Sequence, residues 1–274
     1  MDNRLEALTY KTYGIGSQAI LAFHGFGHPK EDWQFLANYI SRDFKIIAVD
    51  VPGHGDSQFV SVDTLSRPLT KEDWKSLVLQ ILQNEKIDAF HIVGYSLGGR
   101  IGMVTAEMLP SQTRSIHLFS PDGLHKSNSF RFANELKLGR WIFQKLIANV
   151  RLVIPVVKFL NRIKIISDVK RKFVLYQLEN NDRVAQVKIV WSKLSLLWPN
   201  LDTIFQENNF SEPFQVYFGA KDPIILPEYG KPLLKYEREN LKIHTLPFGH
   251  RTAKPEALEW LIKEKKWPFS STDY

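Results

Sequence analysis

The chain has 274 residues, with 36 Lys and Arg against 29 Asp and Glu, which gives a formal net charge of +7. Its 44% hydrophobic and 24% charged content is typical of a globular protein and excludes disordered, collagen-like and repeat chains. The absence of Cys excludes disulfides, thiolate nucleophiles and Cys-ligated metal centres. Residues 1–14 are polar and of mixed charge, so we expect no signal peptide and a cytoplasmic location.

Strands and helices are predicted to alternate along most of the chain. Residues 5–13 alternate apolar and polar positions and end at Gly14, which predicts an antiparallel hairpin at a sheet edge. Helices are predicted at 30–41, 71–84 and 97–109, the second with Thr70 as its N-cap. The alternation predicts an α/β fold with a mostly parallel sheet flanked by helices. Buried strands are predicted at 19–23, 45–49, 89–93, 115–119, 214–218 and 241–245.

The alternation stops between residues 123 and 210, where the pattern is helical and no strand is predicted. We therefore expect a core domain formed by residues 1–122 and 211–274, and a helical cap (lid) formed by residues 123–210. All of the charge excess belongs to this cap, which has 15 Lys and Arg against 6 Asp and Glu, whereas the rest of the chain has 21 against 23.

Apolar residues of the cap include Trp141, Ile142 and Leu146, which share one helical face. We expect most of this face to be buried between cap and core. The apolar run 141–160 is interrupted by three cations, so it does not form a transmembrane segment.

The basic cap has several interpretations. The simplest is a solvated face, and the alternatives are attraction of anionic substrates or weak contact with an acidic membrane surface. No recognition motif for nucleic acid accompanies the charge, so a small-molecule substrate is expected and a nucleic-acid partner is not. The sequence does not predict an oligomeric state.

A glycine-rich turn follows the predicted strand 89–93. The pentapeptide Gly-Tyr-Ser-Leu-Gly at 94–98 lies between that strand and a predicted helix, which is the context of a nucleophile elbow. Such a turn projects the hydroxyl of Ser96 from the edge of the sheet. Because a Ser hydroxyl is a weak nucleophile, it needs a base nearby, and an acid that orients the base.

Two downstream residues supply the acid and the base. Asp222 follows the strand 214–218 and His250 follows the strand 241–245, so both are expected at the same sheet edge as Ser96. Asp122, which also follows a strand, is the alternative acid.

Backbone donors are expected beside the nucleophile. The amides of Phe26 and Leu97 are candidates for an oxyanion hole, since glycines around Phe26 permit close approach of the backbone. Tyr95 and Arg100 flank Ser96 and are candidate substrate-binding residues. No metal site is predicted, because no ligand pattern such as His-Glu-x-x-His occurs.

Taken together, these motifs resemble those of the α/β-hydrolase superfamily over nearly the whole chain. The resemblance implies an eight-stranded, mostly parallel sheet with the cap inserted after the sixth strand. It also implies that Ser96, Asp222 and His250 form a catalytic triad. The motifs that carry it, in the family's order, are His-Gly-Phe-Gly at 24–27, the segment 50–57, the elbow at 94–98, Asp222 and His250.

This constellation predicts a serine hydrolase without a cofactor that cleaves a carboxylic ester or thioester of a small apolar substrate through an acyl-enzyme. The elbow also resembles that of the menaquinone-pathway cyclohexene-carboxylate synthase, in which the counterparts of Tyr95 and Arg100 bind an anionic substrate. A lyase of that kind, or a carbon–carbon bond hydrolase, is therefore an alternative. A catalytically inactive binding scaffold is an alternative of another class.

Overall fold

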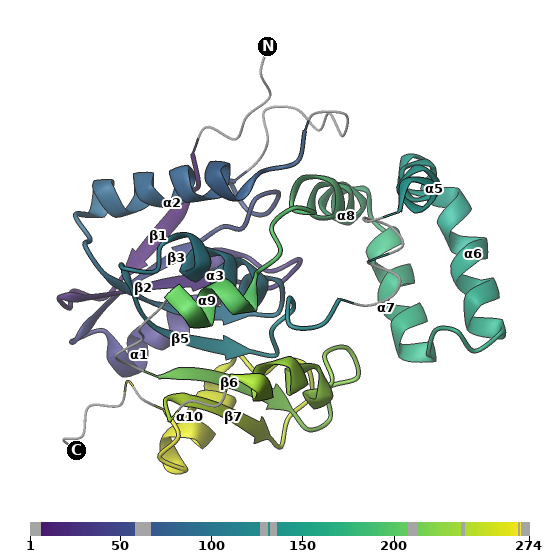
Figure 1. Ribbon diagram of the computed structural model, residues 1–274. Coiled ribbons are helices and arrows are strands. Elements are labelled where there is room, and N and C mark those ends of the chain that lie inside the picture. Colours follow the sequence, from purple (N-terminus) through teal and green to yellow (C-terminus); the bar gives the residue numbers. More distant parts are fainter. Residues whose placement is uncertain are drawn as a thin grey trace.

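The computed structural model describes residues 7–57, 67–126, 131, 136–207, 213–236, 239–267 and 269. Its centre is a sheet of seven strands in the order β1-β3-β2-β4-β5-β6-β7 (Figure 1). All neighbouring strands are parallel except β1 and β3. The predicted α/β fold and its six strands are confirmed, but the strand predicted at 241–245 is wrong as a buried strand, because it forms the edge of the sheet and its Ile243 is exposed. The strands are β1 (Tyr10–Tyr13), β2 (Gln18–Phe23), β3 (Phe44–Val49), β4 (Phe90–Tyr95), β5 (Thr113–Phe119), β6 (Phe214–Gly219) and β7 (Leu241–Leu246).

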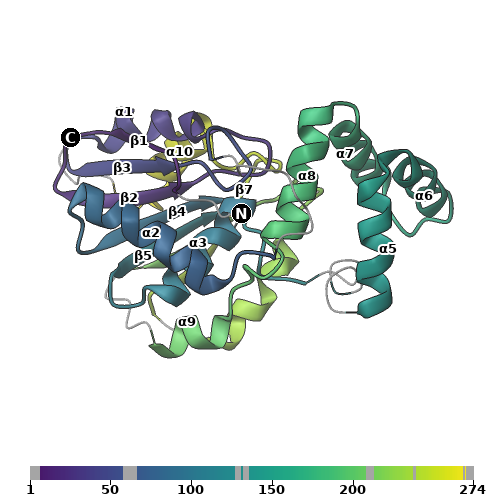
Figure 2. The same ribbon diagram turned by 90° about the horizontal axis from the view of Figure 1, so that it is seen from above.

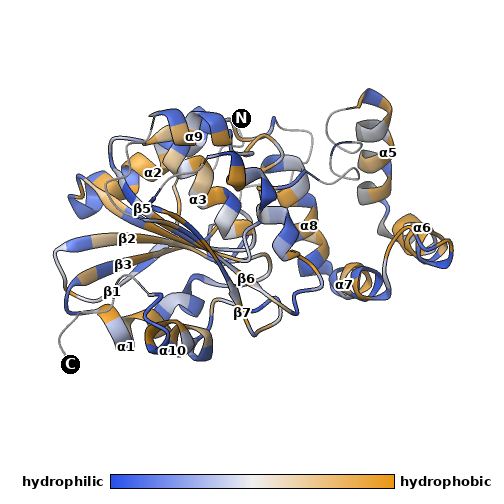
Figure 3. Ribbon diagram, turned by 60° about the horizontal axis from the view of Figure 1, so that its bottom comes forward, coloured by the Kyte–Doolittle hydropathy of each residue, from blue (hydrophilic) through white to orange (hydrophobic). Residues whose placement is uncertain are grey.

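Helices cover both faces of the sheet (Figure 2, Figure 3). One face carries α2 (Lys71–Glu85), α3 (Leu97–Met108) and α9 (Leu201–Glu207), and the other carries α1 (Ala37–Ile40) and α10 (Pro255–Lys263). Two 3-10 helices, η1 (Lys30–Leu36) and η2 (Pro227–Lys235), precede α1 and β7. The predicted helix 30–41 therefore begins as a 3-10 helix and becomes α-helical only at Ala37.

The N-cap predicted for α2 is confirmed. The Thr70 hydroxyl accepts a hydrogen bond from the Asp73 amide (3.1 Å), and the Asp73 carboxylate accepts one from the Thr70 amide (2.9 Å). This reciprocal pair satisfies two amides that the first turn of a helix leaves without partners.

The edge strand β1 differs from its prediction. It pairs with β3, with Tyr10 opposite Val49, and not with β2, which follows it in the chain, so no hairpin forms. The strands β2 and β3 are parallel, so the chain between them crosses one face of the sheet through η1 and α1. The outer edge of β3 is then free to pair with β1. The described residues form seven strands where the resemblance implies eight. Residues 5 and 6 of the predicted hairpin lie outside the described residues.

Four helices between β5 and β6 stand beyond one end of the sheet (Figure 1, Figure 2). The helix α8 lies between the core and the other three, and its Ile189 contacts the turn at Gly53, where an added Cβ would lie 2.5 Å from the Ile189 side chain. Among the described residues no helix is both long and apolar enough to cross a membrane. The four helices are α5 (Lys137–Ala148), α6 (Val150–Arg162), α7 (Asp168–Leu178) and α8 (Asn181–Lys193).

The apolar face predicted for residues 141–146 is only partly buried. Trp141 is 58% exposed, whereas Ile142 and Leu146 are half-buried. The reason is that α5 contacts α6 and the Trp191 ring of α8 through Phe143, at 4.8 Å between ring centroids, and lies away from the sheet. The expectation that this face packs between cap and core is therefore wrong for Trp141.

The first turn of α3 lies directly against the end of β2. A Cβ added at Gly98 would lie 2.0 Å from the carbonyl oxygen of Phe23 and 2.6 Å from that of His24. Both oxygens belong to the backbone, so they cannot turn aside as a flexible side chain can. Gly98 is therefore required for α3 to start where it does.

We predict that Gly98→Ala lowers the free energy of unfolding by about 2 to 3 kcal/mol, because α3 or β2 must shift to admit the methyl group. Urea unfolding measures the change. Gly249→Ala is the control, since a Cβ added there would lie 3.7 Å from its nearest neighbour, the carbonyl oxygen of Lys221. Equal losses in the two variants would contradict the close contact as the cause.

Candidate active site

Ser96 occupies a strained turn between β4 and α3. Its φ of 52° and ψ of −115° lie in a region that non-glycine residues rarely adopt. Four backbone hydrogen bonds hold the turn: the Ser96 amide donates to the Phe119 carbonyl (3.0 Å), and the Ser96 carbonyl accepts from the amides of Gly99 and Asp122 (both 2.9 Å) and of Arg100 (3.4 Å). The side chain is half-exposed at the carboxyl end of β4.

Asp222 and His250 meet at the neighbouring strand ends. The Nδ1 of His250 lies 2.7 Å from the Oδ2 of Asp222. Because the carboxylate can only accept, Nδ1 donates, and the neutral imidazole then carries its lone pair on Nε2. The other oxygen, Oδ1, accepts from the amides of Ile224 (2.8 Å) and Ile225 (2.9 Å). The carboxylate is therefore fixed on both oxygens.

The Asp222 carboxylate is fully buried, yet it favours its charged form. Burial acts to raise the pKa of Asp222, but the hydrogen bond and charge of His250 and the two backbone amides outweigh burial and hold the pKa below its ordinary value. Asp222 therefore stays ionised at neutral pH and holds the imidazole in one orientation.

The loop that carries His250 is joined to the elbow by contacts that the sequence did not reveal. The Thr252 hydroxyl donates to the Ser120 hydroxyl (3.0 Å), and both residues are buried. The His250 ring lies 5.4 Å from the ring of Tyr95, the residue before Ser96. Ser and Thr hydroxyls in loops carry no sequence signal that predicts such pairing over 132 positions.

The candidate oxyanion donors lie beside Ser96. A Cβ added at Gly25 would lie 3.4 Å from the Ser96 Cβ, so the loop that carries Phe26 touches the elbow. Within the described part of the chain neither the Phe26 nor the Leu97 amide donates a hydrogen bond. Two backbone donors next to the nucleophile are thus available to a ligand.

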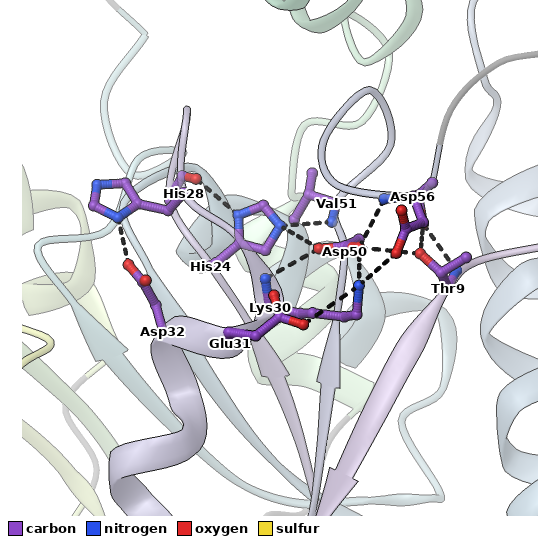
Figure 4. Close-up of polar contacts among 11 residues, drawn as sticks. Thr9, His24, His28, Lys30, Glu31, Asp32, Asp50, Val51 and Asp56 are labelled. Carbon is purple, nitrogen blue, oxygen red and sulfur yellow. Dashed lines mark hydrogen bonds and ion pairs between the residues drawn. The ribbon is translucent and has the colours of Figure 1, made fainter.

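A buried polar network holds the loop of Phe26 in place (Figure 4). The carbonyl of Gly25 accepts from the Nδ1 of His24 (2.8 Å), and the Nε2 of His24 accepts from the Val51 amide (2.9 Å). These two partners require the neutral ring, with its proton on Nδ1. His24 thereby ties the loop after β2 to the loop after β3.

The centre of this network is the ion pair of Lys30 and Asp50. The Nζ of Lys30 donates to Asp50 (2.7 Å) and to Asp56 (3.0 Å), and Asp50 also accepts from the hydroxyl of Thr9 (3.1 Å). Burial acts to lower the pKa of Lys30, but its two carboxylate partners outweigh burial and raise it. A lysine in a predicted surface helix carried no sign of this role in the sequence.

The two candidate acids have different partners. Asp122 accepts from the Gly123 amide (2.8 Å), and its Oδ2 lies 3.5 Å from the Nε of Arg100. Arg100 itself is buried, with its guanidinium 5.4 Å from the centre of the Trp198 ring. In this structure His250 is thus bonded to Asp222, while Asp122 faces Arg100.

Tyr95 is buried on the face of the sheet that carries α10, opposite the face that carries α3. Burial raises the pKa of its hydroxyl, and Asp222 raises it further. Tyr95 lines a small pocket beside the His250 loop with His24, His28, Asp32, Trp33, Arg251 and Ala253.

Among the described residues no group of three His, Asp or Glu side chains is arranged to hold a metal ion.

The comparisons with known proteins agree with this fold. A family model described as alpha/beta hydrolase fold matches residues 18–252. A hydrolase of known structure from Pseudomonas aeruginosa PA01 has a TM-score of 0.62 and 18% sequence identity, and the match covers 94% of this chain and 93% of that chain. At this identity the likeness shows the fold alone.

Curated relatives match a part of the chain. Monoacylglycerol lipase ABHD6 from Bos taurus is 33% identical over 119 residues, which are 43% of this chain and 35% of the lipase. The dihydrolipoyllysine-residue acetyltransferase component of the acetoin cleaving system from Cupriavidus necator is 31% identical over 114 residues, which are 42% of this chain and 29% of the transferase. The aligned part spans about a third of the length of these two relatives.

The buried His24 leads to a prediction on pH. Burial, reinforced by the neighbouring His54, lowers the pKa of His24 to about 3. The unfolded chain binds a proton there below about pH 6.5, whereas the folded protein does not. The contribution of neutral His24 to stability is therefore fully present above the unfolded value and is lost as the pH falls toward the folded value.

We predict that the free energy of unfolding rises with pH between about pH 4 and pH 5.5, and that His24→Gln reduces the slope by about 1.4 kcal/mol per pH unit. Urea unfolding at several pH values measures the slope. The control is His125→Gln, because His125 is exposed. An unchanged slope in His24→Gln would show that His24 is protonated in the folded protein.

Proposed function

The chain belongs to the α/β-hydrolase family, and from that membership we propose that it is a serine hydrolase that cleaves a carboxylic ester of a small apolar substrate. Ser96 is the nucleophile, His250 is the general base, and Asp222 orients the base. The observation that carries the proposal is the 2.7 Å hydrogen bond between Asp222 and His250 at the sheet edge where the strained turn presents Ser96.

In the proposed reaction, the Ser96 oxygen attacks the carbonyl carbon of the ester while its proton passes to the Nε2 of His250. The imidazolium is stabilised by Asp222. It then gives the proton to the departing alkoxide, and an acyl-enzyme is left on Ser96. Water attacks the acyl group as one of its protons passes to His250. His250 then gives this proton to the Ser96 oxygen as the acid is released, which restores the free enzyme.

The negative charge of the tetrahedral intermediate requires donors that are already in place. The amides of Phe26 and Leu97 are assigned this role because both are free of other bonds and adjoin the elbow. The network of His24, Lys30 and Asp50 supports it, since this network fixes the loop that presents Phe26. Each donor of this kind stabilises the transition state by roughly 3 to 4 kcal/mol.

The surroundings favour an apolar acyl or alcohol group. Leu97 belongs to one apolar cluster together with Leu124 and, from α8, Ile189 and Val190, and Phe26 packs against that cluster. A relative that bears the name monoacylglycerol lipase supports an ester of this kind. In this proposal α5 to α8 act as a cap over the site, with α8 as its inner wall. The helix α9, which lies within the cap predicted at 123–210, packs instead against α3 on the sheet. The cytoplasmic location stays a prediction.

The alternatives receive less support. A lyase or carbon–carbon hydrolase with an anionic substrate was suggested by Arg100, but that guanidinium is buried against Asp122 and Trp198. No observation favours it over ester cleavage. A binding scaffold without activity would have no need for an ionised Asp222 bonded to His250. Ester turnover and covalent labelling distinguish such a scaffold from an active hydrolase.

We predict that the protein hydrolyses a short p-nitrophenyl ester and reacts covalently with a fluorophosphonate probe. Ser96→Ala should lower kcat by roughly 10³-fold to 10⁶-fold and abolish labelling, because no other group at the site replaces the hydroxyl. Ser111→Ala, at an exposed serine, is the control and should retain both. A native protein without turnover or labelling would support the scaffold alternative instead.

The acid is tested by a pair of matched variants. Asp222→Asn should lower kcat by about 10²-fold to 10⁴-fold, because the amide cannot stabilise the imidazolium and favours the other tautomer. Asp122→Asn should change kcat by less than about tenfold, because Asp122 faces Arg100. Thermal unfolding of both variants verifies folding. The reverse order of effects would assign the acid to Asp122.

A further inference from the structure

Exposed apolar side chains are concentrated in one part of the molecule. Of the 16 large hydrophobic side chains that are exposed among the described residues, 11 lie between Leu136 and Tyr176. This segment comprises α5, α6 and most of α7, the helices farthest from the sheet (Figure 1). Single exposed apolar residues are ordinary, but a gathering of this kind marks an interaction surface.

The helix α6 presents the clearest such surface. Leu152, Val156, Phe159 and Ile163 follow one another at intervals of four, three and four residues, so they form one row along the helix and its end. All four are exposed, and Phe159 is 60% exposed. We call this row the α6 face. The opposite side of the helix is turned inward, since Val157 is buried.

Cations accompany the α6 face. Lys158 and Arg162 are exposed and four residues apart, which places them in a second row beside the apolar one. The helix contains no Asp or Glu. Over residues 137–178 the chain has ten Lys and Arg and one acidic residue, Asp168. Figure 3 shows hydrophobic and hydrophilic positions side by side on α6 and α7.

We propose that the α6 face docks on the surface of an anionic phospholipid bilayer. A helix with an apolar row and a basic row lies in the plane of a membrane interface, where the apolar side chains enter the acyl boundary and the cations contact lipid phosphates. Long Lys and Arg side chains reach the phosphates while their stems remain on apolar surface. The charge complementarity is with acidic lipid headgroups.

Charge also argues against a second copy of the chain as the occupant. An interface between two α6 faces would bring together two segments that each carry ten cations and one acidic residue. Like charges at close range oppose such pairing. The neighbouring helices α5 and α7 add further exposed apolar and basic residues, among them Trp141, Phe173 and Lys172.

The proposal does not depend on the chemistry at Ser96. It assigns a peripheral membrane contact to the outermost helices, whereas the triad lies at the sheet edge. The test therefore uses binding and not activity.

The full chain is sedimented with vesicles of phosphatidylcholine alone and with vesicles of equal parts phosphatidylcholine and phosphatidylglycerol. Binding to the anionic vesicles should be at least about tenfold tighter. It should weaken when NaCl is raised from about 0.05 M to about 0.5 M, because salt screens the headgroup charge. Equal binding to both vesicles, or no binding, overturns the proposal.

Two variants separate the apolar row from the basic one. The double variant Phe159→Ser with Ile163→Ser should weaken binding by about tenfold or more, since it removes inserted apolar surface. Its control is Leu226→Ser with Leu234→Ser, at two exposed leucines of the core domain, and should bind as the native protein does. A loss in the control equal to that in the α6 variant overturns the assignment to α6.

The triple variant Lys158→Glu, Arg162→Glu and Lys172→Glu should weaken binding to anionic vesicles by at least about tenfold. Its control reverses the charges of Lys11, Lys231 and Lys242, which are exposed on the core. Sedimentation velocity without lipid detects self-association. Dimers that the Phe159 and Ile163 variant abolishes would overturn the proposal in favour of a second copy. Thermal unfolding of each variant verifies folding.

Discussion

The approach of α3 to the end of β2 is the contact on which the rest of the site depends. With no side chain at Gly98, the first turn of the helix reaches the carbonyl oxygens of Phe23 and His24. The chain can then leave β4, turn sharply at Ser96 and enter α3 within one residue. The unfavourable backbone angles of Ser96 are held by its four backbone hydrogen bonds and by this packing. One close contact thus places the helix, the elbow and the adjoining loop together.

Around this contact the molecule buries His24, Asp50 and Asp222, and each of these three has a partner that explains its burial. The ion pair of Lys30 and Asp50 fixes the loop after β2, and the neutral ring of His24 joins it to the loop after β3. Two backbone amides hold the Asp222 carboxylate in addition to its hydrogen bond with His250. Because unpaired buried charge is costly, these loops have one arrangement each, and the groups expected to react are positioned before a substrate arrives.

The packing of apolar residues in the outer helices differs from that in the core. In the core, apolar residues meet across both faces of the sheet, whereas α5–α7 pack mainly on one another and leave apolar residues exposed among cations. The sequence localised the positive charge to this segment. It did not show that Trp141 and Phe159 lie outside, because an amphipathic pattern is the same whether its apolar face meets a protein core or another partner.

Local patterns were sufficient to predict the strands, the alternation of strand and helix, the Thr70 cap and the elbow, because each of these depends on the spacing of neighbouring residues. Order along the chain also favoured Asp222 and His250. Tertiary structure alone decided that β1 joins β3, that Asp122 faces Arg100 while Asp222 faces His250, and that Lys30 is buried against Asp50. These outcomes depend on which distant segments meet, and a pairing between residues 20 to 39 positions apart leaves no periodicity in the sequence.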